Sequence, residues 1–122
     1  MPDSNRKTDL SRCAAQWLAA QPGLASERDA PGPFTRAEMD AALRGLAACD
    51  DAEARRRLRV LRRRVMVRTM SRDLDGQALL NEVCGAMSDL AESVIAAALD
   101  CAVARLAPEF GRARDAEGRA QE

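Results

Sequence analysis

Arginine and the carboxylates are the residue types with which this chain could do chemistry, because none of its 122 residues is histidine. Nine arginines and no acidic residue lie within residues 55–72. Guanidinium groups bind carboxylates and phosphates through forked hydrogen bonds, so this block predicts ion pairs inside the fold or an anionic partner. Without histidine, a serine–histidine triad, a histidine–cysteine zinc site and histidine ligation of haem are excluded within this chain.

The best-placed carboxylates for a metal are Asp73 and Asp75, which follow the arginine block. On a helix, their i, i+2 spacing points the two side chains in different directions. We therefore interpret Asp75, which precedes Gly76, as a turn residue and Asp73 as the partner of a nearby arginine. The sequence predicts no metal ligand and no catalytic residue in this chain.

The four cysteines do not form a metal or redox motif, because none reaches a C-x-x-C spacing. We expect them to be small buried hydrophobic residues, at Cys13, Cys49, Cys84 and Cys101. Residues 1–7 lack the apolar stretch of a secretory signal, and the longest uncharged run, residues 13–26, is too short to span a membrane. We therefore expect a cytoplasmic setting and no membrane partner.

The zero net charge of the chain hides an uneven distribution. Six basic and nine acidic residues precede the arginine block, and four basic and ten acidic residues follow it. A protein that coats nucleic acid would not usually neutralise itself so completely, and no aromatic residue lies within the block. An arginine-rich nucleic-acid binder is therefore the least favoured of three hypotheses. A stand-alone helical module that docks a protein partner through Trp17 and the alanine-rich C-terminal helix is the second.

The elements that must position these side chains are helices, because alanine, leucine and arginine dominate while β-branched and aromatic residues are scarce. We expect an all-α fold without a sheet, a bundle of about four helices with a long C-terminal helix. The helices are expected at about residues 10–21, 35–47, 51–74 and 77–107. Because a short Asp75-Gly76 link joins the last two, these should form an antiparallel hairpin.

Local signals place the first two helices. Asp9 or Ser11 is expected to cap the first helix. Trp17 lies on the apolar face of this helix and is interpreted as a core anchor. A short connector is expected over residues 23–33, which contain Pro-Gly-Pro. Thr35 and Glu38 then form a capping box, with Phe34 and Met39 as a hydrophobic staple. One apolar stripe is expected on the second helix, at Met39, Ala42, Leu43, Leu46 and Ala47.

Apolar residues occur on two sides of the third helix, with the arginines between them, so this helix should lie between neighbours. Its main stripe comprises Ala54, Leu58, Leu61, Val65 and Thr69, and Val60, Val67 and Leu74 lie nearly opposite. The apolar residues of the fourth helix repeat every three or four positions, namely Leu80, Val83, Met87, Leu90, Val94, Ala97, Ala98 and Cys101. This helix also supplies acids that could face the arginines, at Glu82, Asp89, Glu92 and Asp100.

The stretch LRVLRRRVMVRTMSRDLDG, residues 58–76, followed by NEVCGAMSDLAESVIAAAL, residues 81–99, resembles the bacterial glutamine synthetase adenylyltransferase/deadenylyltransferase family. The most specific part is RRRxMxRxxxRDL, Arg62 to Leu74. SRCAAQWLAA, residues 11–20, and PFTRAEM, residues 33–39, also resemble the N-terminal half of the family. The resemblance implies transfer of AMP from ATP to a tyrosine of glutamine synthetase and its removal by phosphorolysis, with ATP and Mg²⁺ as cofactors. It also implies glutamine synthetase and a nitrogen-signalling regulatory protein as partners.

Family members continue into a nucleotidyltransferase domain with a glycine-rich turn and paired aspartates that hold Mg²⁺, and this sequence contains neither motif. We therefore expect an N-terminal fragment that is inactive alone. It would comprise a disordered N-terminus at 1–9, a helical domain at 10–110, and a linker at 111–122 toward the absent domain. Most arginines are expected to serve the architecture. The candidates for contact with downstream elements or a nucleotide phosphate are Arg63, Arg64, Arg68 and Arg72.

Overall fold

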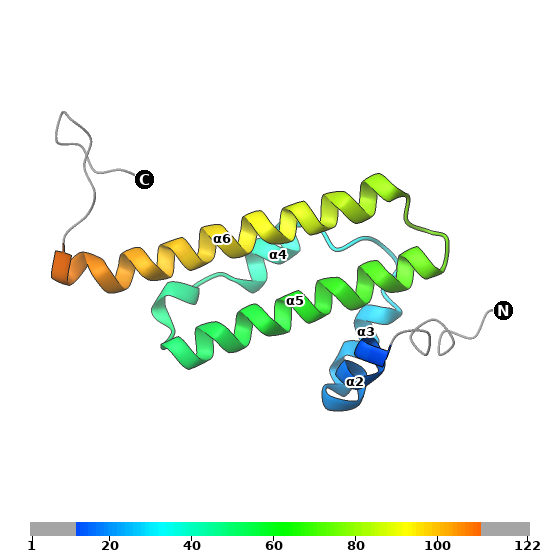
Figure 1. Ribbon diagram of the computed structural model, residues 1–122, viewed down its shortest axis with the longest axis horizontal. Coiled ribbons are helices and arrows are strands. Elements are labelled where there is room, and N and C mark those ends of the chain that lie inside the picture. Colours follow the sequence, from blue (N-terminus) through cyan, green and yellow to red (C-terminus); the bar gives the residue numbers. More distant parts are fainter. Residues whose placement is uncertain (1–11, 111–122) are drawn as a thin grey trace.

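The structure, a computed structural model, describes residues 12–110, and all regular structure within that range is helical (Figure 1). This confirms the all-α prediction. The elements are α2 (Arg12–Ala20), the 3₁₀ turn η1 (Pro22–Leu24), α3 (Ala25–Arg28), α4 (Arg36–Ala42), the 3₁₀ turn η2 (Leu46–Ala48), α5 (Asp51–Leu74) and α6 (Leu80–Phe110). The predicted N-terminal segment 1–9, both candidate caps of the first helix and the predicted linker 111–122 lie outside the described residues.

Helices α5 and α6 run antiparallel and form the predicted hairpin (Figure 1). The turn between them begins at Gly76, whose φ of 70° is left-handed. The Gly76 amide donates to the carbonyl of Asp73 and the Gln77 amide to that of Arg72, so two carbonyls at the end of α5 are satisfied. Asp75 is the C-cap residue, which agrees with its interpretation as a turn residue.

The centre of the fold is α5, with the α4–η2 segment and α6 on one side and α3 on another (Figure 1). The predicted stripe is buried at Ala54, Leu61, Val65 and Thr69. Val67 is fully buried on a different side of the helix, and the Ser71 hydroxyl there donates to the carbonyl of Arg28 at 2.8 Å. The prediction that this helix lies between neighbours is therefore confirmed.

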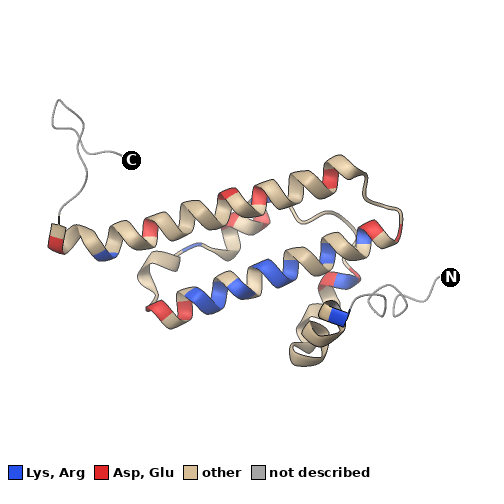
Figure 2. Cartoon of the chain, viewed as in Figure 1, with Lys and Arg blue, Asp and Glu red and all other residues tan. Residues whose placement is uncertain are grey.

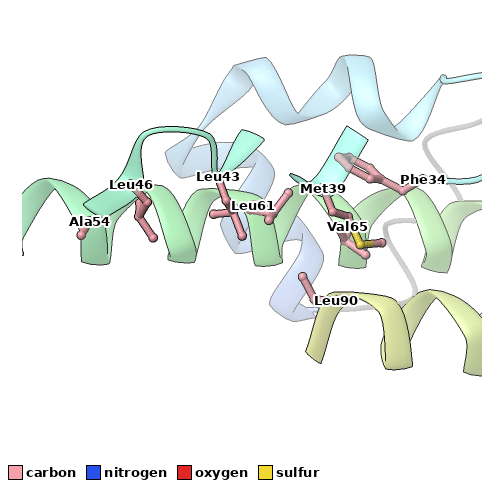
Figure 3. Packing of buried hydrophobic residues seen from close by; sticks show 8 residues of the cluster. All are labelled: Phe34, Met39, Leu43, Leu46, Ala54, Leu61, Val65 and Leu90. Atoms are coloured by element: carbon pink, nitrogen blue, oxygen red, sulfur yellow. The ribbon is translucent and has the colours of Figure 1, made fainter. Parts of the chain in front are cut away.

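Side chains from three helices and η2 meet in one hydrophobic cluster (Figure 3). Met39 from α4 and Leu61 and Val65 from α5 are at most 1% exposed, and Leu90 comes from α6. Leu58, Met87 and Val94 pack against the cluster, and other members are Phe34, Leu43, Leu46 and Ala54. Because burial of such side chains is the main favourable term in folding, this cluster holds α4, η2 and α6 against α5.

Side chains cap the starts of both α4 and α5, and the cap at Thr35 is the predicted one. The Thr35 hydroxyl accepts a hydrogen bond from the Glu38 amide at 3.2 Å, and the Asp50 carboxylate accepts one from the Glu53 amide at 2.8 Å. Phe34 is 3% exposed, which agrees with its part in the predicted hydrophobic staple. The carboxylate of Glu38, however, binds Arg68 of α5, so only half of the capping box forms.

Two predictions in the N-terminal half are wrong. Residues 23–33 are not a plain connector, because they contain most of η1 and all of α3. Proline favours the first position of a helical turn, and here Pro22 begins η1 while Leu24 is buried. The second helix ends at Ala42, and Gly45, with a φ of 74°, separates it from η2, so Ala47 is exposed instead of joining the stripe.

The fourth helix differs from its prediction at both ends. It begins at Leu80, which is 79% exposed and therefore not part of the core, and it continues through Pro108 to Phe110. Proline removes one amide donor, and close to the end of a helix the carbonyl left without it can bind water. None of the described helices is long and apolar enough to cross a membrane.

Neither Trp17 nor the cysteines are buried as predicted. Trp17 is partly exposed, Cys13 and Cys84 are exposed, and Cys49 and Cys101 are only partly buried. All four thiols are free. The helical pattern identified the apolar face of α2, but this short helix has few neighbours, so that face remains partly open to solvent.

We predict that Gly76→Ala lowers the free energy of unfolding by about 1 kcal/mol, because a side chain with Cβ disfavours a left-handed backbone. The control is Gly85→Ala within α6, where a Cβ meets nothing within 4 Å. That change should stabilise the protein by about 0.5–1 kcal/mol through helix propensity. Urea denaturation followed by circular dichroism measures both, and effects of the same sign would contradict the prediction.

Candidate functional site on the arginine helix

The nine arginines of α5 are spread along the helix, and acidic residues of other elements pair with three of them (Figure 2). Five bind carboxylates, namely Arg55, Arg56, Arg64, Arg68 and Arg72. Arg57 binds backbone carbonyls instead. The remaining three, Arg59, Arg62 and Arg63, form no ion pair with the residues that the structure describes. The block is therefore divided between six arginines that are bound within the module and three that have no ion pair there.

A buried carboxylate, Glu27 of α3, accepts hydrogen bonds from two of these arginines. Arg64 Nε lies 2.8 Å from Glu27 Oε1, and Arg68 Nε lies 2.9 Å from Glu27 Oε2. The side chains of Glu27 and Arg68 are 8% and 12% exposed, so this pair lies largely out of water. A buried carboxylate is stable when its oxygens are hydrogen-bonded and its charge is paired, and both conditions are met here.

The same arginines cover the ring of Phe34. The guanidinium carbon of Arg68 lies 4.3 Å from the ring centroid and that of Arg64 lies 5.1 Å from it. Arg68 also donates through Nη1 to Glu38 at 2.8 Å. One side chain of α5 therefore binds α3, the start of α4 and the aromatic residue between them, combining charge-assisted hydrogen bonds with a cation–π contact.

Arg72 connects α5 and α6 next to the turn between them. Its Nη2 and Nε donate to the two carboxylate oxygens of Glu82, at 2.7 and 3.2 Å, and the Arg72 side chain is 13% exposed. Further donation reaches the carbonyls of Pro31 and Gln77. The hydrogen bond to Glu82 raises the pKa of Arg72. This guanidinium links α5, α6 and the loop before α4.

Arg57 closes the end of α4. Its Nη2 donates to the carbonyls of Ala42 and Arg44, at 2.7 and 2.8 Å, and its Nη1 lies 3.4 Å from Cys49 Sγ. Carbonyls at the end of a helix lack partners within that helix, so the guanidinium satisfies groups that would otherwise need water.

The three arginines without an ion pair, Arg59, Arg62 and Arg63, lie beside aromatic and apolar groups. The guanidinium carbons of Arg62 and Arg63 each lie 5.9 Å from the centroid of the Trp17 ring. Arg59 and Arg62 border a groove of about 340 Å³ between α5 and α6. Its other lining residues are apolar, namely Leu58, Met87, Leu90, Ala91 and Val94. An apolar groove with two cations at its edge fits a partner with an apolar side and negative charge.

Of the acids that were expected to face the arginine helix, one does so. Glu82 binds Arg72, but Glu92 binds Arg36 of α4 at 2.8 Å. Asp89 and Asp100 form no ion pair with the described residues, and the same holds for Asp73, which is exposed. The reason is that α6 presents different sides to α4 and α5, which the linear order of charges does not reveal.

A polar contact between α4 and α6 lies at the edge of the core. The buried Ser93 hydroxyl donates to Asp40 Oδ1 at 2.9 Å, and Arg36 Nε donates to the same oxygen at 3.2 Å. The hydrogen bond from Ser93, and then that from Arg36, lower the pKa of Asp40. The carboxylate is therefore held in its ionised form by a side chain from each helix.

The four arginines proposed from sequence are thus in different situations. Arg64, Arg68 and Arg72 are bound to carboxylates inside the fold, and Arg63 lies beside Trp17. Their contact with a further domain or a phosphate stays a prediction. Sequence reasoning missed Glu27, the carboxylate on which two of them converge. Its only signal is that it is one of two acids, with Asp29, in a stretch that was interpreted as a connector. Within residues 12–110, no group of three acidic or cysteine side chains could hold a metal ion.

The sequence model of the glutamate-ammonia ligase adenylyltransferase family matches residues 8–122. The chain belongs to this family. The match covers the N-terminal elements, α5 and α6, and therefore includes all nine arginines of α5.

Several curated adenylyltransferase relatives are similar to the chain, each carrying the name bifunctional glutamine synthetase adenylyltransferase/adenylyl-removing enzyme. The relative from Thioalkalivibrio sulfidiphilus is 40% identical over 88% of this chain and 12% of its own length. The relative from Nitrosomonas europaea is 42% identical over 74% of this chain and 10% of its own length. The relative from Burkholderia mallei is 38% identical over 88% of this chain and 12% of its own length. The chain therefore spans about an eighth of the length of these relatives. No solved structure matches it significantly.

We predict that Glu27→Gln lowers the free energy of unfolding by about 2 kcal/mol, because it leaves Arg64 and Arg68 without their shared negative charge. The control is Glu53→Gln, which removes an exposed pair with Arg56 and should change stability by less than about 0.5 kcal/mol. Urea denaturation monitored by circular dichroism gives both values. Equal losses of unfolding free energy in the two variants would show that burial of Glu27 does not strengthen its contribution to stability.

We predict that Ser93→Ala raises the pKa of Asp40 toward its ordinary value, because its strongest hydrogen-bond donor is lost. In the folded protein the pKa of Asp40 lies below that of the unfolded chain. The resulting stabilisation is complete above about pH 5 and disappears as the pH falls through the folded pKa. Stability of Ser93→Ala should therefore depend less on pH in this acidic window.

An NMR titration of the Asp40 carboxyl carbon measures this pKa directly. The matched control is Ser88→Ala, an exposed serine on the same helix. An Asp40 pKa that is the same in Ser93→Ala, Ser88→Ala and the unchanged protein would contradict the prediction.

Proposed function

We propose that this chain is the N-terminal helical module of a bifunctional glutamine synthetase adenylyltransferase/adenylyl-removing enzyme. The observation that carries the proposal is the family match over residues 8–122, supported by relatives that bear this name. The enzyme would transfer AMP from ATP to glutamine synthetase and remove it by phosphorolysis, in the cytoplasm. A nitrogen-signalling regulatory protein is the proposed second partner.

Within such an enzyme, the module acts as a scaffold. Its arginines support this role, because Arg64, Arg68 and Arg72 use their donors on carboxylates of the same module. ATP and Mg²⁺ would act in the nucleotidyltransferase part of the longer protein. The scaffold sets the position of that part, and positioning carries much of phosphoryl- and nucleotidyl-transfer catalysis.

The second candidate function is protein docking by the helical module itself. The observation that favours it is the apolar groove bordered by Arg59 and Arg62. These two arginines and Arg63 have no carboxylate partner among residues 12–110. They are the guanidinium groups best placed to meet a further domain, and Arg63 is the one among them that was also a candidate from the sequence.

We predict that the isolated chain neither adds AMP to glutamine synthetase nor removes it. A chimera should be active in both directions when residues 8–122 replace the matching segment of the Thioalkalivibrio sulfidiphilus relative. The measurement is incorporation and release of labelled AMP on glutamine synthetase with ATP, phosphate and Mg²⁺. The unchanged relative is the positive control.

Variants of the chimera distinguish the scaffold role of the module from its docking role. Glu27→Gln should reduce activity in proportion to the loss of folded protein, whereas Arg63→Ala should reduce activity per folded molecule. Labelling by the isolated chain above background would contradict the scaffold role. A folded but inactive chimera would contradict the family function of this segment.

A further inference from the structure

The hairpin of α5 and α6 is covered differently on its two sides by the described residues. On one side, the α4–η2 segment contacts both helices. On another side lies the apolar groove that is lined by Leu58, Met87 and Ala91 and bordered by Arg59 and Arg62. In helical bundles, a groove between two packed helices is the place where a further helix packs.

The apolar groove and the α4–η2 segment lie on different sides of the hairpin. Ser93, whose hydroxyl donates to α4, lies about 160° around α6 from Ala91 at 100° per residue. Arg57, which donates to a carbonyl at the end of α4, lies about 140° around α5 from Arg62. The α4–η2 segment therefore does not close the apolar groove.

The border of the groove indicates an occupant with negative charge. Arg59 and Arg62 are exposed and form no ion pair with residues 12–110, whereas Arg64 and Arg68 are bound to Glu27. The other lining residues are apolar. Guanidinium groups bind carboxylates through charge-assisted hydrogen bonds, and complementary charge sets the orientation of a partner. The matching surface is a helix with one apolar side and with aspartate or glutamate beside it.

The size of the groove indicates where that helix comes from. The groove has a volume of about 340 Å³ and seven lining residues. A specific interface between separate proteins uses roughly 20–30 residues on each side. A much smaller contact is sufficient within one polypeptide, because the linkage gives an effective concentration in the millimolar range. The chain spans about an eighth of the length of its relatives, so an enzyme of that length has further sequence to supply the helix.

We propose that an acidic amphipathic helix from the remainder of the same polypeptide occupies this groove in the longer enzyme. The proposal rests on the proposed function and specifies how the module attaches to the rest of that enzyme. The apolar side of the helix packs on Leu58 and Met87, and its carboxylates bind Arg59 and Arg62. Met87 suits this role because its flexible thioether side chain adapts to the shape of an incoming surface.

The test places the photo-crosslinking residue p-benzoylphenylalanine at Ala91 in the chimera with the Thioalkalivibrio sulfidiphilus relative. Ala91 is exposed within the groove, so the probe reaches whatever occupies it. Mass spectrometry should locate the cross-link outside residues 8–122, in a segment whose acidic residues border an apolar side at helical spacing. The matched control is the same probe at Ala96, which is also exposed but lies about 140° around α6 from Ala91. It should not cross-link to that segment.

Charge reversal tests the role of the arginines. Arg59→Glu should lower the yield of the cross-link from position 91 at least about fivefold, because it sets a carboxylate against those of the occupant. The control is Arg44→Glu, the same change at an exposed arginine outside the groove, and it should leave the yield unchanged. Circular dichroism should show the same helix content for every variant. A yield that Arg59→Glu does not lower would overturn the proposal.

A second measurement uses the 122-residue chain as it is. An array of overlapping peptides that cover the rest of the relative is probed with the labelled chain. The chain should bind peptides in which acidic residues border an apolar side, and Arg59→Glu should weaken this binding while Arg44→Glu does not. An array without bound peptides, or binding only to peptides that lack this pattern, would count against the proposed occupant.

Failure of this proposal and failure of the proposed function are distinguishable. An active chimera that cross-links only within residues 8–122 would overturn the occupant and leave the enzyme function in place. A chimera that cross-links as expected but is inactive in both directions would contradict the function and leave the occupant in place. A cross-link to added glutamine synthetase, with none to the same polypeptide, would also overturn the proposal, because the groove would then serve a separate partner.

Discussion

The arrangement of the whole module depends on the burial of one carboxylate, Glu27, between the guanidiniums of Arg64 and Arg68. Nine positive charges on one helix repel one another, and a buried acid in contact with two of them reduces that repulsion where water cannot. The same contact attaches the short α3 helix, which has little apolar surface of its own, to the side of α5 that faces away from α6. Removing the charge would therefore affect both the electrostatics and the architecture.

Arginine suits a helix that lies between neighbours because it combines an apolar stem with a planar, multidentate head. On α5, Arg68 binds two carboxylates and stacks on Phe34, while Arg57 satisfies carbonyls at the end of α4. A lysine at either position would offer a single point of charge and no flat surface. The arginines thus act as connections between elements, and α5 needs fewer large apolar residues than a helix in such a central place usually contains.

Sequence reasoning succeeded where the cause is local. The cap at Thr35 and the turn at Asp75 and Gly76 depend on neighbours within a few residues, so these boundaries were predictable. Glu27 and Trp17 were misjudged because their environments come from α5, more than thirty residues away in the chain. The division of the arginines into bound and surface groups was not predictable for the same reason. Periodicity shows which face of a helix is apolar, but not which neighbour covers it.

The reliance of α5 on arginine, in a chain without histidine, makes its electrostatics independent of acidity under physiological conditions. Guanidinium groups stay charged throughout, and carboxylates change state only in acid, so the charge pattern is constant from about pH 6 to 8. Ionic strength is then the variable that can modulate this surface. With a Debye length of about 8 Å at 0.15 M salt, the buried contacts of Glu27 are shielded from counterions, whereas Arg59, Arg62 and Arg63 are not. The region therefore combines an interior that is insensitive to salt with an exterior that responds to it.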